Sequence, residues 1–147
     1  MASDRGVTMI PGPDAQRIRA QLMIWWIIWA SVLSGLIVLY YFLGRSPQAP
    51  AEPGANPLAG LAGLVPLFVS IIIRWLVLPR SAAPGPALVM FIIGLSLAEG
   101  CGLLGIFLGG PYREDLFVLG VLGVAQFVPL YARKYYEPKP QGFIPNN

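Results

Sequence analysis

The chain has 147 residues, of which 56% are hydrophobic and 12% are charged, and its net charge is +3. Soluble domains carry roughly 25% charged residues, so this composition disfavours a soluble fold and favours one compact membrane unit. Histidine is absent and Cys101 is the only cysteine, which removes the commonest metal ligand and general base and excludes an internal disulfide.

The first half of the chain is predicted to contain two membrane helices. Residues 1–21 form a polar N-terminal segment, and residues 22–42 form an apolar block. This block is longer than a signal-peptide core of about 7–15 residues, so we expect an uncleaved helix. The proline-rich stretch 44–57 is expected to be a linker, and the second helix is expected over 58–78, with a kink at Pro66.

Two more apolar blocks follow after a short turn rich in proline and glycine. They cover residues 87–109 and 116–132, and Glu114 and Asp115 suit the start of the last helix. The last block is short for a bilayer, and residues 133–147 form a polar tail that we expect to be flexible. The sequence therefore predicts an all-α, integral membrane, four-helix bundle with antiparallel helices.

The distribution of basic residues predicts the orientation of this bundle. With four crossings, one side would hold only Arg45 and Arg113, and the other side would hold the rest of the arginine and lysine residues. By the positive-inside rule the richer side is cytoplasmic, so both termini are expected in the cytoplasm and the protein in the cell inner membrane. The basic residues of the richer side are Arg5, Arg17, Arg19, Arg74, Arg80, Arg133, Lys134 and Lys139.

Glu99 lies near the middle of the third block, where a charged side chain costs roughly 2.5–3.5 kcal/mol to insert. Polar side chains at similar depth are its candidate partners, in a layer that would hold the helices together. Arg74 is expected to extend to the inner headgroups, with a salt bridge to Glu99 as the alternative. The candidate partners at the midplane are Ser31, Ser34, Ser70, Ser96 and Gln126.

The third block also carries a ridge of small residues that favours close packing of helices in lipid. Its partner could be in this chain, where Gly60, Gly63, Gly120 and Gly123 offer facing surfaces, or in another copy. The ridge consists of Gly94, Ala98, Gly102 and Gly105.

The string LAEGCGLLG at residues 97–105 resembles the carboxylate-bearing helix of the rotary ATPase proteolipid, subunit c. That resemblance implies that Glu99 takes up and releases a translocated proton or ion. It covers only about 15 residues, and the glycine-rich companion helix, the polar loop signature and the internal duplication of that family are missing. The whole chain resembles the small, uncharacterised four-helix bacterial membrane proteins that share an ALAE-type helix.

These features predict a multi-pass membrane protein that is not an enzyme. The acidic residues other than Glu99 lie in loops or at helix ends, and no phosphate loop, metal-ligand spacing or cofactor motif is present. We expect an accessory or structural component that packs in the lipid bilayer against itself or within a larger membrane complex, without nucleic acid. The alternative is a proton- or ion-translocating subunit that uses Glu99.

Overall fold

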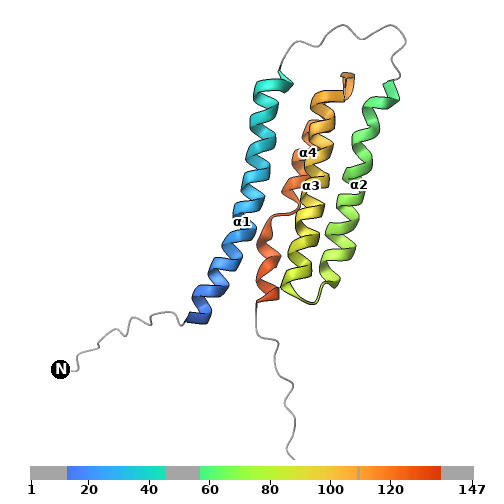
Figure 1. The fold of residues 1–147 in the computed structure, drawn as a ribbon. Helices are drawn as coiled ribbons and strands as arrows, with labels where there is room; N and C mark the ends of the chain where they lie inside the picture. Colours follow the sequence, from blue (N-terminus) through green and yellow to red (C-terminus); the bar gives the residue numbers. More distant parts are fainter. Residues whose placement is uncertain (1–12, 46–56, 109, 137–147) are drawn as a thin grey trace, which may run out of the picture.

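The computed structural model describes residues 13–45, 57–108 and 110–136, and every regular element in them is helical. Residues 46–56 of the predicted linker, residues 1–12 of the predicted polar segment and residues 137–147 of the predicted tail lie outside the described residues. Four α-helices form the body of the protein (Figure 1): α1 (Pro13–Leu39), α2 (Leu64–Ile72), α3 (Pro84–Leu108) and α4 (Arg113–Ala125).

Short π and 3₁₀ segments extend these α-helices at their ends. They are η1 (Tyr40–Gly44), η2 (Pro57–Gly63), η3 (Ile73–Val77), η4 (Leu78–Arg80), η5 (Gly110–Tyr112) and η6 (Pro129–Tyr135). With these extensions, four continuous stretches are long and apolar enough to cross a membrane, which confirms the predicted number of helices. Those stretches are Gln16–Gly44, Leu61–Arg80, Pro84–Leu108 and Gly110–Tyr135.

The boundaries of the helices differ from the predicted ones where proline begins a helix. α1 begins at Pro13 and α3 begins at Pro84, several residues before the apolar blocks begin. Proline suits the first helical position because the N–H that it lacks has no partner inside the helix. Pro66 lies in the first turn of α2, directly after the 3₁₀ turn of η2, where one missing N–H costs little.

The fourth span is not the single short helix that the apolar block 116–132 predicted. α4 begins at Arg113, with Glu114 and Asp115 in its first turn, and ends at Ala125. The chain then turns, and Val128 adopts an extended conformation (φ −46°, ψ 124°) before η6 begins at Pro129. A residue before proline is disfavoured in helical conformation and proline donates no backbone hydrogen bond, so the break follows from Pro129.

α3 and α4 lie in the middle of the molecule, with α1 on one side and α2 on the other (Figure 1). Phe91 and Phe127 are fully buried between these central elements, and their rings meet edge to face with centroids 6.0 Å apart. The span that contains α1 is the least buried of the four. Of its most apolar 18-residue segment, 11% is buried inside the protein, against 39% for the segment in α3. α1 packs mainly through the buried side chains of Trp25 and Leu36.

Candidate functional site

Glu99 lies on α3 at the margin of the packed face of that helix. Its neighbour Ala98 is fully buried, whereas Ser96, one turn earlier, is exposed and Glu99 itself is partly exposed. No side chain among the described residues forms a hydrogen bond or an ion pair with the Glu99 carboxylate. The only acidic or basic side chain of α3 is therefore accessible from outside the bundle and has no bonded partner in the described part of the chain.

The predicted polar partners of Glu99 are dispersed in the structure. The Ser70 hydroxyl is buried and donates a 2.8 Å hydrogen bond to the Gly94 carbonyl, which joins α2 to α3. Ser31 and Ser34 are exposed on α1, and Gln126 lies in the turn after α4. Within the described residues, none of the predicted partners is bonded to Glu99, so they do not form a shared polar layer around it.

Arg74, in η3, points into the bundle towards the break in the fourth span. Its Nε donates a 2.7 Å hydrogen bond to the main-chain carbonyl of Gln126. Its guanidinium carbon lies 4.2 Å from the ring centroid of Tyr131 and 5.5 Å from that of Trp75. The alternative salt bridge to Glu99 is not formed, because the carbonyl freed by the helix break and the aromatic rings provide closer partners. The reach of Arg74 to the inner headgroups stays a prediction.

A second side chain bonds to the main chain near the same break. Trp29 of α1 donates from its indole Nε1 to the Val124 carbonyl at 2.9 Å. Side chains from α1 and η3 thus reach the last turn of α4 from two sides. In an apolar environment an unpaired carbonyl costs several kcal/mol, so the bond from Arg74 to the Gln126 carbonyl makes the break tolerable. The Val124 carbonyl also accepts from the Phe127 N–H at 3.0 Å, so the Trp29 bond adds a second donor to it. This cluster was not predicted from the sequence, although Pro129 indicates a break in the fourth span.

The predicted ridge of small residues packs within this chain. All four of its members are buried, and they face α4 and its neighbours. A Cβ atom on Gly120 would lie 2.6 Å from the Cα and N atoms of Gly102, and one on Gly123 would lie 3.1 Å from the Ala98 Cβ. The backbones of α3 and α4 therefore touch, and this contact needs glycine at position 120.

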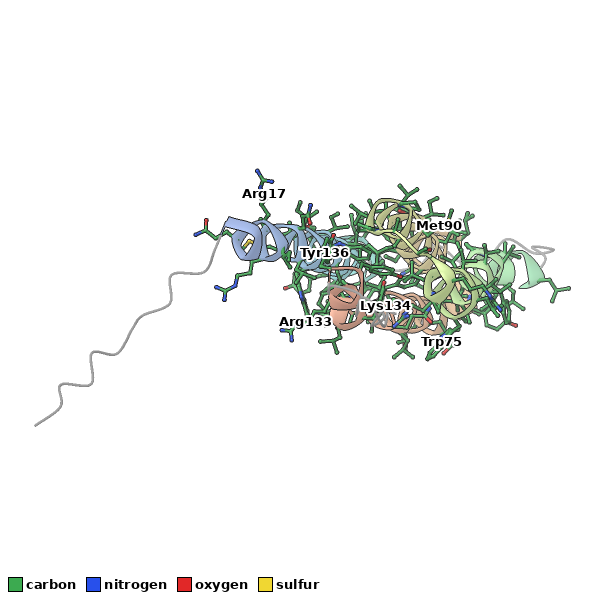
Figure 2. All side chains as sticks on the ribbon, turned by 90° about the horizontal axis from the view of Figure 1, so that it is seen from below. Arg17, Trp75, Met90, Arg133, Lys134 and Tyr136 are labelled. Carbon is green, nitrogen blue, oxygen red and sulfur yellow. The ribbon has the colours of Figure 1, made fainter. Side chains whose placement is uncertain are left out.

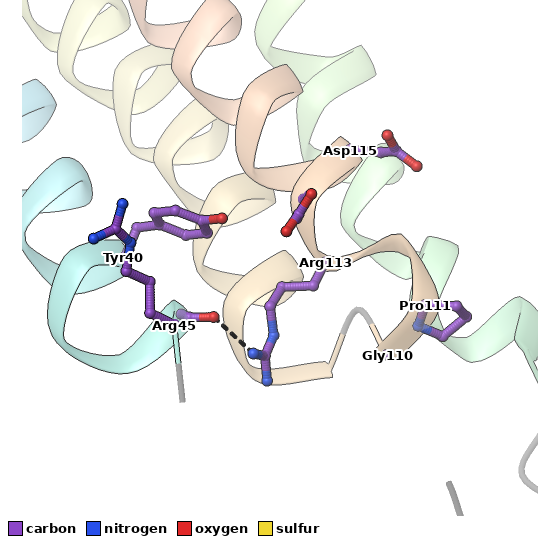
Figure 3. A pocket seen from close by; sticks show the side chains of 8 residues that line it. Tyr40, Arg45, Gly110, Pro111, Arg113 and Asp115 are labelled. Carbon is purple, nitrogen blue, oxygen red and sulfur yellow. Dashed lines mark hydrogen bonds between the residues drawn. The ribbon is translucent and has the colours of Figure 1, made fainter. Parts of the chain in front are cut away.

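A cavity lies at the end of the bundle where η1 meets the start of α4 (Figure 3). It has a volume of about 780 Å³, and Arg113 crosses it to donate a 2.7 Å hydrogen bond to the Gly44 carbonyl. The charged residues in its lining are Arg45, Arg113, Glu114 and Asp115. The two positive and two negative charges balance, so the lining has no evident preference for an anion or a cation.

The described residues contain no group of three histidine, cysteine or acidic side chains placed to hold a metal ion. Cys101 is buried, and its thiol donates to the Leu116 carbonyl at 3.6 Å. No protein-family model, curated protein or solved structure matches this chain. The resemblance of residues 97–105 to the proteolipid helix therefore stays a prediction from those residues alone.

Proposed function

We propose that the chain is a multi-pass protein of the cell inner membrane with four antiparallel spans and both termini in the cytoplasm. Large apolar side chains are exposed on all four helices, among them Met23, Phe68, Phe107 and Leu122. An apolar surface of this extent is rare on monomeric soluble proteins and suits contact with lipid. The basic residues Arg17, Arg133 and Lys134 lie at one end of the bundle (Figure 2), which is the end that we assign to the cytoplasm.

In this membrane the protein acts as an accessory or structural component that packs against itself or a larger partner, without catalytic activity. The observation that carries the proposal is the accessible Glu99 carboxylate without a bonded partner in the described part of the chain. A carboxylate at membrane depth is expensive unless another group hydrogen-bonds to it. The small-residue ridge is already used by α4, so a further helix that covers Ser96 and Glu99 would have to pack on the outer side of α3.

Photo-cross-linking in native membranes tests this role. A photoreactive amino acid at Ser96 should capture one defined protein, which mass spectrometry would identify as a second copy or another subunit. The same amino acid at Phe68, which is exposed on α2, is the control and should capture lipid only. Glu99→Gln keeps the hydrogen-bonding capacity and should preserve the complex in mild detergent, whereas Glu99→Leu should dissociate it. A complex of unchanged size in Glu99→Leu, with no protein captured from Ser96, would refute the proposal.

A second candidate function is proton or ion translocation by Glu99, as in a proteolipid-like subunit. It is favoured by the accessibility of this carboxylate from outside the bundle, because a site that exchanges protons has to be reached from its surroundings. A hydrophobic carbodiimide should then label Glu99 selectively, and Glu99→Gln should abolish proton flux into vesicles while the complex persists. In the accessory role, Glu99→Gln leaves both the complex and the flux unchanged.

A further inference from the structure

A groove runs between α1 and η6 at the end of the bundle that carries Arg133 (Figure 2). It has a volume of about 260 Å³. Its lining is apolar apart from one guanidinium group, and it consists of Leu22, Trp26, Pro129, Leu130 and Arg133. The exposed fractions of Leu130 and Trp26 are 72% and 41%, so the groove opens to the surroundings of the protein.

The groove lies directly after the break in the fourth span. Pro129, the first residue of η6, forms part of its wall. Leu130 and Arg133 are three residues apart, and side chains at this spacing point the same way in a 3₁₀ helix. Together they present one apolar and one cationic group towards α1.

A second arginine lies on the same stripe of α1 as two of the groove residues, nearer the end of the bundle. Arg19, Leu22 and Trp26 are spaced at i, i+3 and i+7 on α1, so they lie along one stripe of the helix. At about 1.5 Å per residue, Arg19 is about 10 Å further along the axis than Trp26. The stripe therefore passes from a tryptophan, through a leucine, to a cation at the end that we assign to the cytoplasmic surface.

The charge of the groove is of one sign in the part of the chain that the structure describes. No described acidic side chain lines it: Glu99 lies on α3, and Glu114 and Asp115 line the cavity beside η1, together with Gly44 of η1. A ligand that fits it has an anionic end beside two guanidinium groups and an apolar part beside leucine, proline and tryptophan. A phospholipid has this arrangement, and its phosphate and first acyl carbons lie at the depths of the arginines and of Trp26.

We propose that this groove binds one anionic phospholipid of the cytoplasmic leaflet, with its phosphate on Arg19 and Arg133 and an acyl chain against Leu22, Trp26 and Leu130. The proposal rests on the membrane location proposed above. Basic recesses between spans on the cytoplasmic side favour anionic headgroups over zwitterionic ones because of the added charge attraction.

Native mass spectrometry of the full chain in detergent, titrated with phosphatidylglycerol or phosphatidylcholine, tests the proposal. We expect one phosphatidylglycerol to bind with clear preference. Each arginine should contribute about fivefold in affinity, so the double variant R19Q/R133Q should lose most of the preference. The matched control is R17Q/K134Q, which removes the same charge at the same end. Arg17 lies on the opposite side of α1, and the Lys134 Nζ lies over the Tyr135 ring at 4.8 Å, away from the groove.

Fluorescence locates the acyl chain. Phosphatidylglycerol with brominated acyl chains, added in equimolar amount, should quench tryptophan emission. This quenching should be lost in Trp26→Phe and retained in Trp75→Phe, since Trp75 is more exposed than Trp26 but lies on η3, away from the groove. Equal binding of both lipids, or equal losses in the R19Q/R133Q and R17Q/K134Q variants, would overturn the proposal.

Two further measurements separate this proposal from its alternatives. If a second copy occupies the groove, Leu130→Cys in a Cys101→Ser background will form a disulfide-linked dimer in membranes, and the lipid site is then wrong. If alkaline carbonate extracts the chain from membranes, the proposed membrane location fails. If the chain stays in the membrane but shows no preference for phosphatidylglycerol, only the lipid site fails.

Discussion

The Nε of Arg74 donates a hydrogen bond to the carbonyl of Gln126 at the point where the fourth span stops being α-helical. In an α-helix that carbonyl would accept from the N–H of Leu130, but here Leu130 donates to Val128 at 2.9 Å instead. The side chain of Arg74 therefore replaces a missing main-chain donor. The need for a donor to the Gln126 carbonyl explains why an arginine is held inside the bundle.

Replacing Arg74 should destabilise the protein. Arg74→Gln removes a hydrogen bond from a charged donor, worth about 1.5–3 kcal/mol, and also the contact with the Tyr131 ring. We expect the free energy of unfolding in mixed micelles to fall by about that amount. Arg80→Gln is the control, because Arg80 is exposed and bonds only to the Leu76 carbonyl of its own span. Equal stability of the two variants would contradict the role assigned to Arg74.

The cost of losing Arg74 should depend on Pro129. In Pro129→Ala the chain can continue as an α-helix, so the Leu130 N–H becomes free to bond to the Gln126 carbonyl. Arg74→Gln should then cost less in the Pro129→Ala background than in the native one. A double-mutant cycle should give a coupling free energy of at least about 0.5 kcal/mol, whereas additive effects would show that the two residues act independently.

The sequence predicted the number of spans but not this cluster. Hydropathy identified four helices because each is apolar over its whole length, a property that is local in the chain. The inward position of Arg74 depends on Gln126 and Tyr131, more than fifty residues away, and no local pattern could indicate it. Pro129 did offer a local signal for the break, which the mean hydropathy of the block 116–132 does not register.

The ridge of small residues on α3 shows a second limit of prediction from the sequence. Its small residues predicted close packing but not the partner, since glycines were available on two other helices and in other copies. The structure assigns the contact to Gly120 and Gly123, because only folding brings those residues opposite Ala98 and Gly102. Glu99 remains the least predictable residue, because no side chain in the described part of the chain bonds to it.

Enlarging Gly120 should separate the central helices. In Gly120→Ala the new methyl group would lie 2.6 Å from the backbone of Gly102, which has no side chain to move. Overpacking of this kind costs about 1–3 kcal/mol, so the melting temperature in detergent should fall. The control is Gly100→Ala on α3, where a Cβ has no neighbour within 4 Å and the higher helix propensity of alanine should be neutral or stabilising. Equal melting temperatures of the two variants would be inconsistent with direct contact between the backbones of α3 and α4.

The proposed orientation predicts which turns are reached from outside the cell. In a Cys101→Ser background, which retains a donor for the Leu116 carbonyl, single cysteines can be placed at the exposed residues Ala82 and Pro111. A membrane-impermeant maleimide should label Pro111→Cys in intact cells and should label Ala82→Cys only after lysis. Labelling of both sites in intact cells, or the reverse pattern, would contradict four spans with cytoplasmic termini.

The contact of Gly102 with Gly120 also limits how a solute could cross the membrane through this protein. Because the two backbones touch, there is no room for a continuous chain of water molecules between α3 and α4. Phe91 and Phe127 fill the space nearer η6. A conduit along the axis of a single subunit is thus blocked. A permeation path that includes the accessible Glu99 carboxylate would instead follow the outer side of α3.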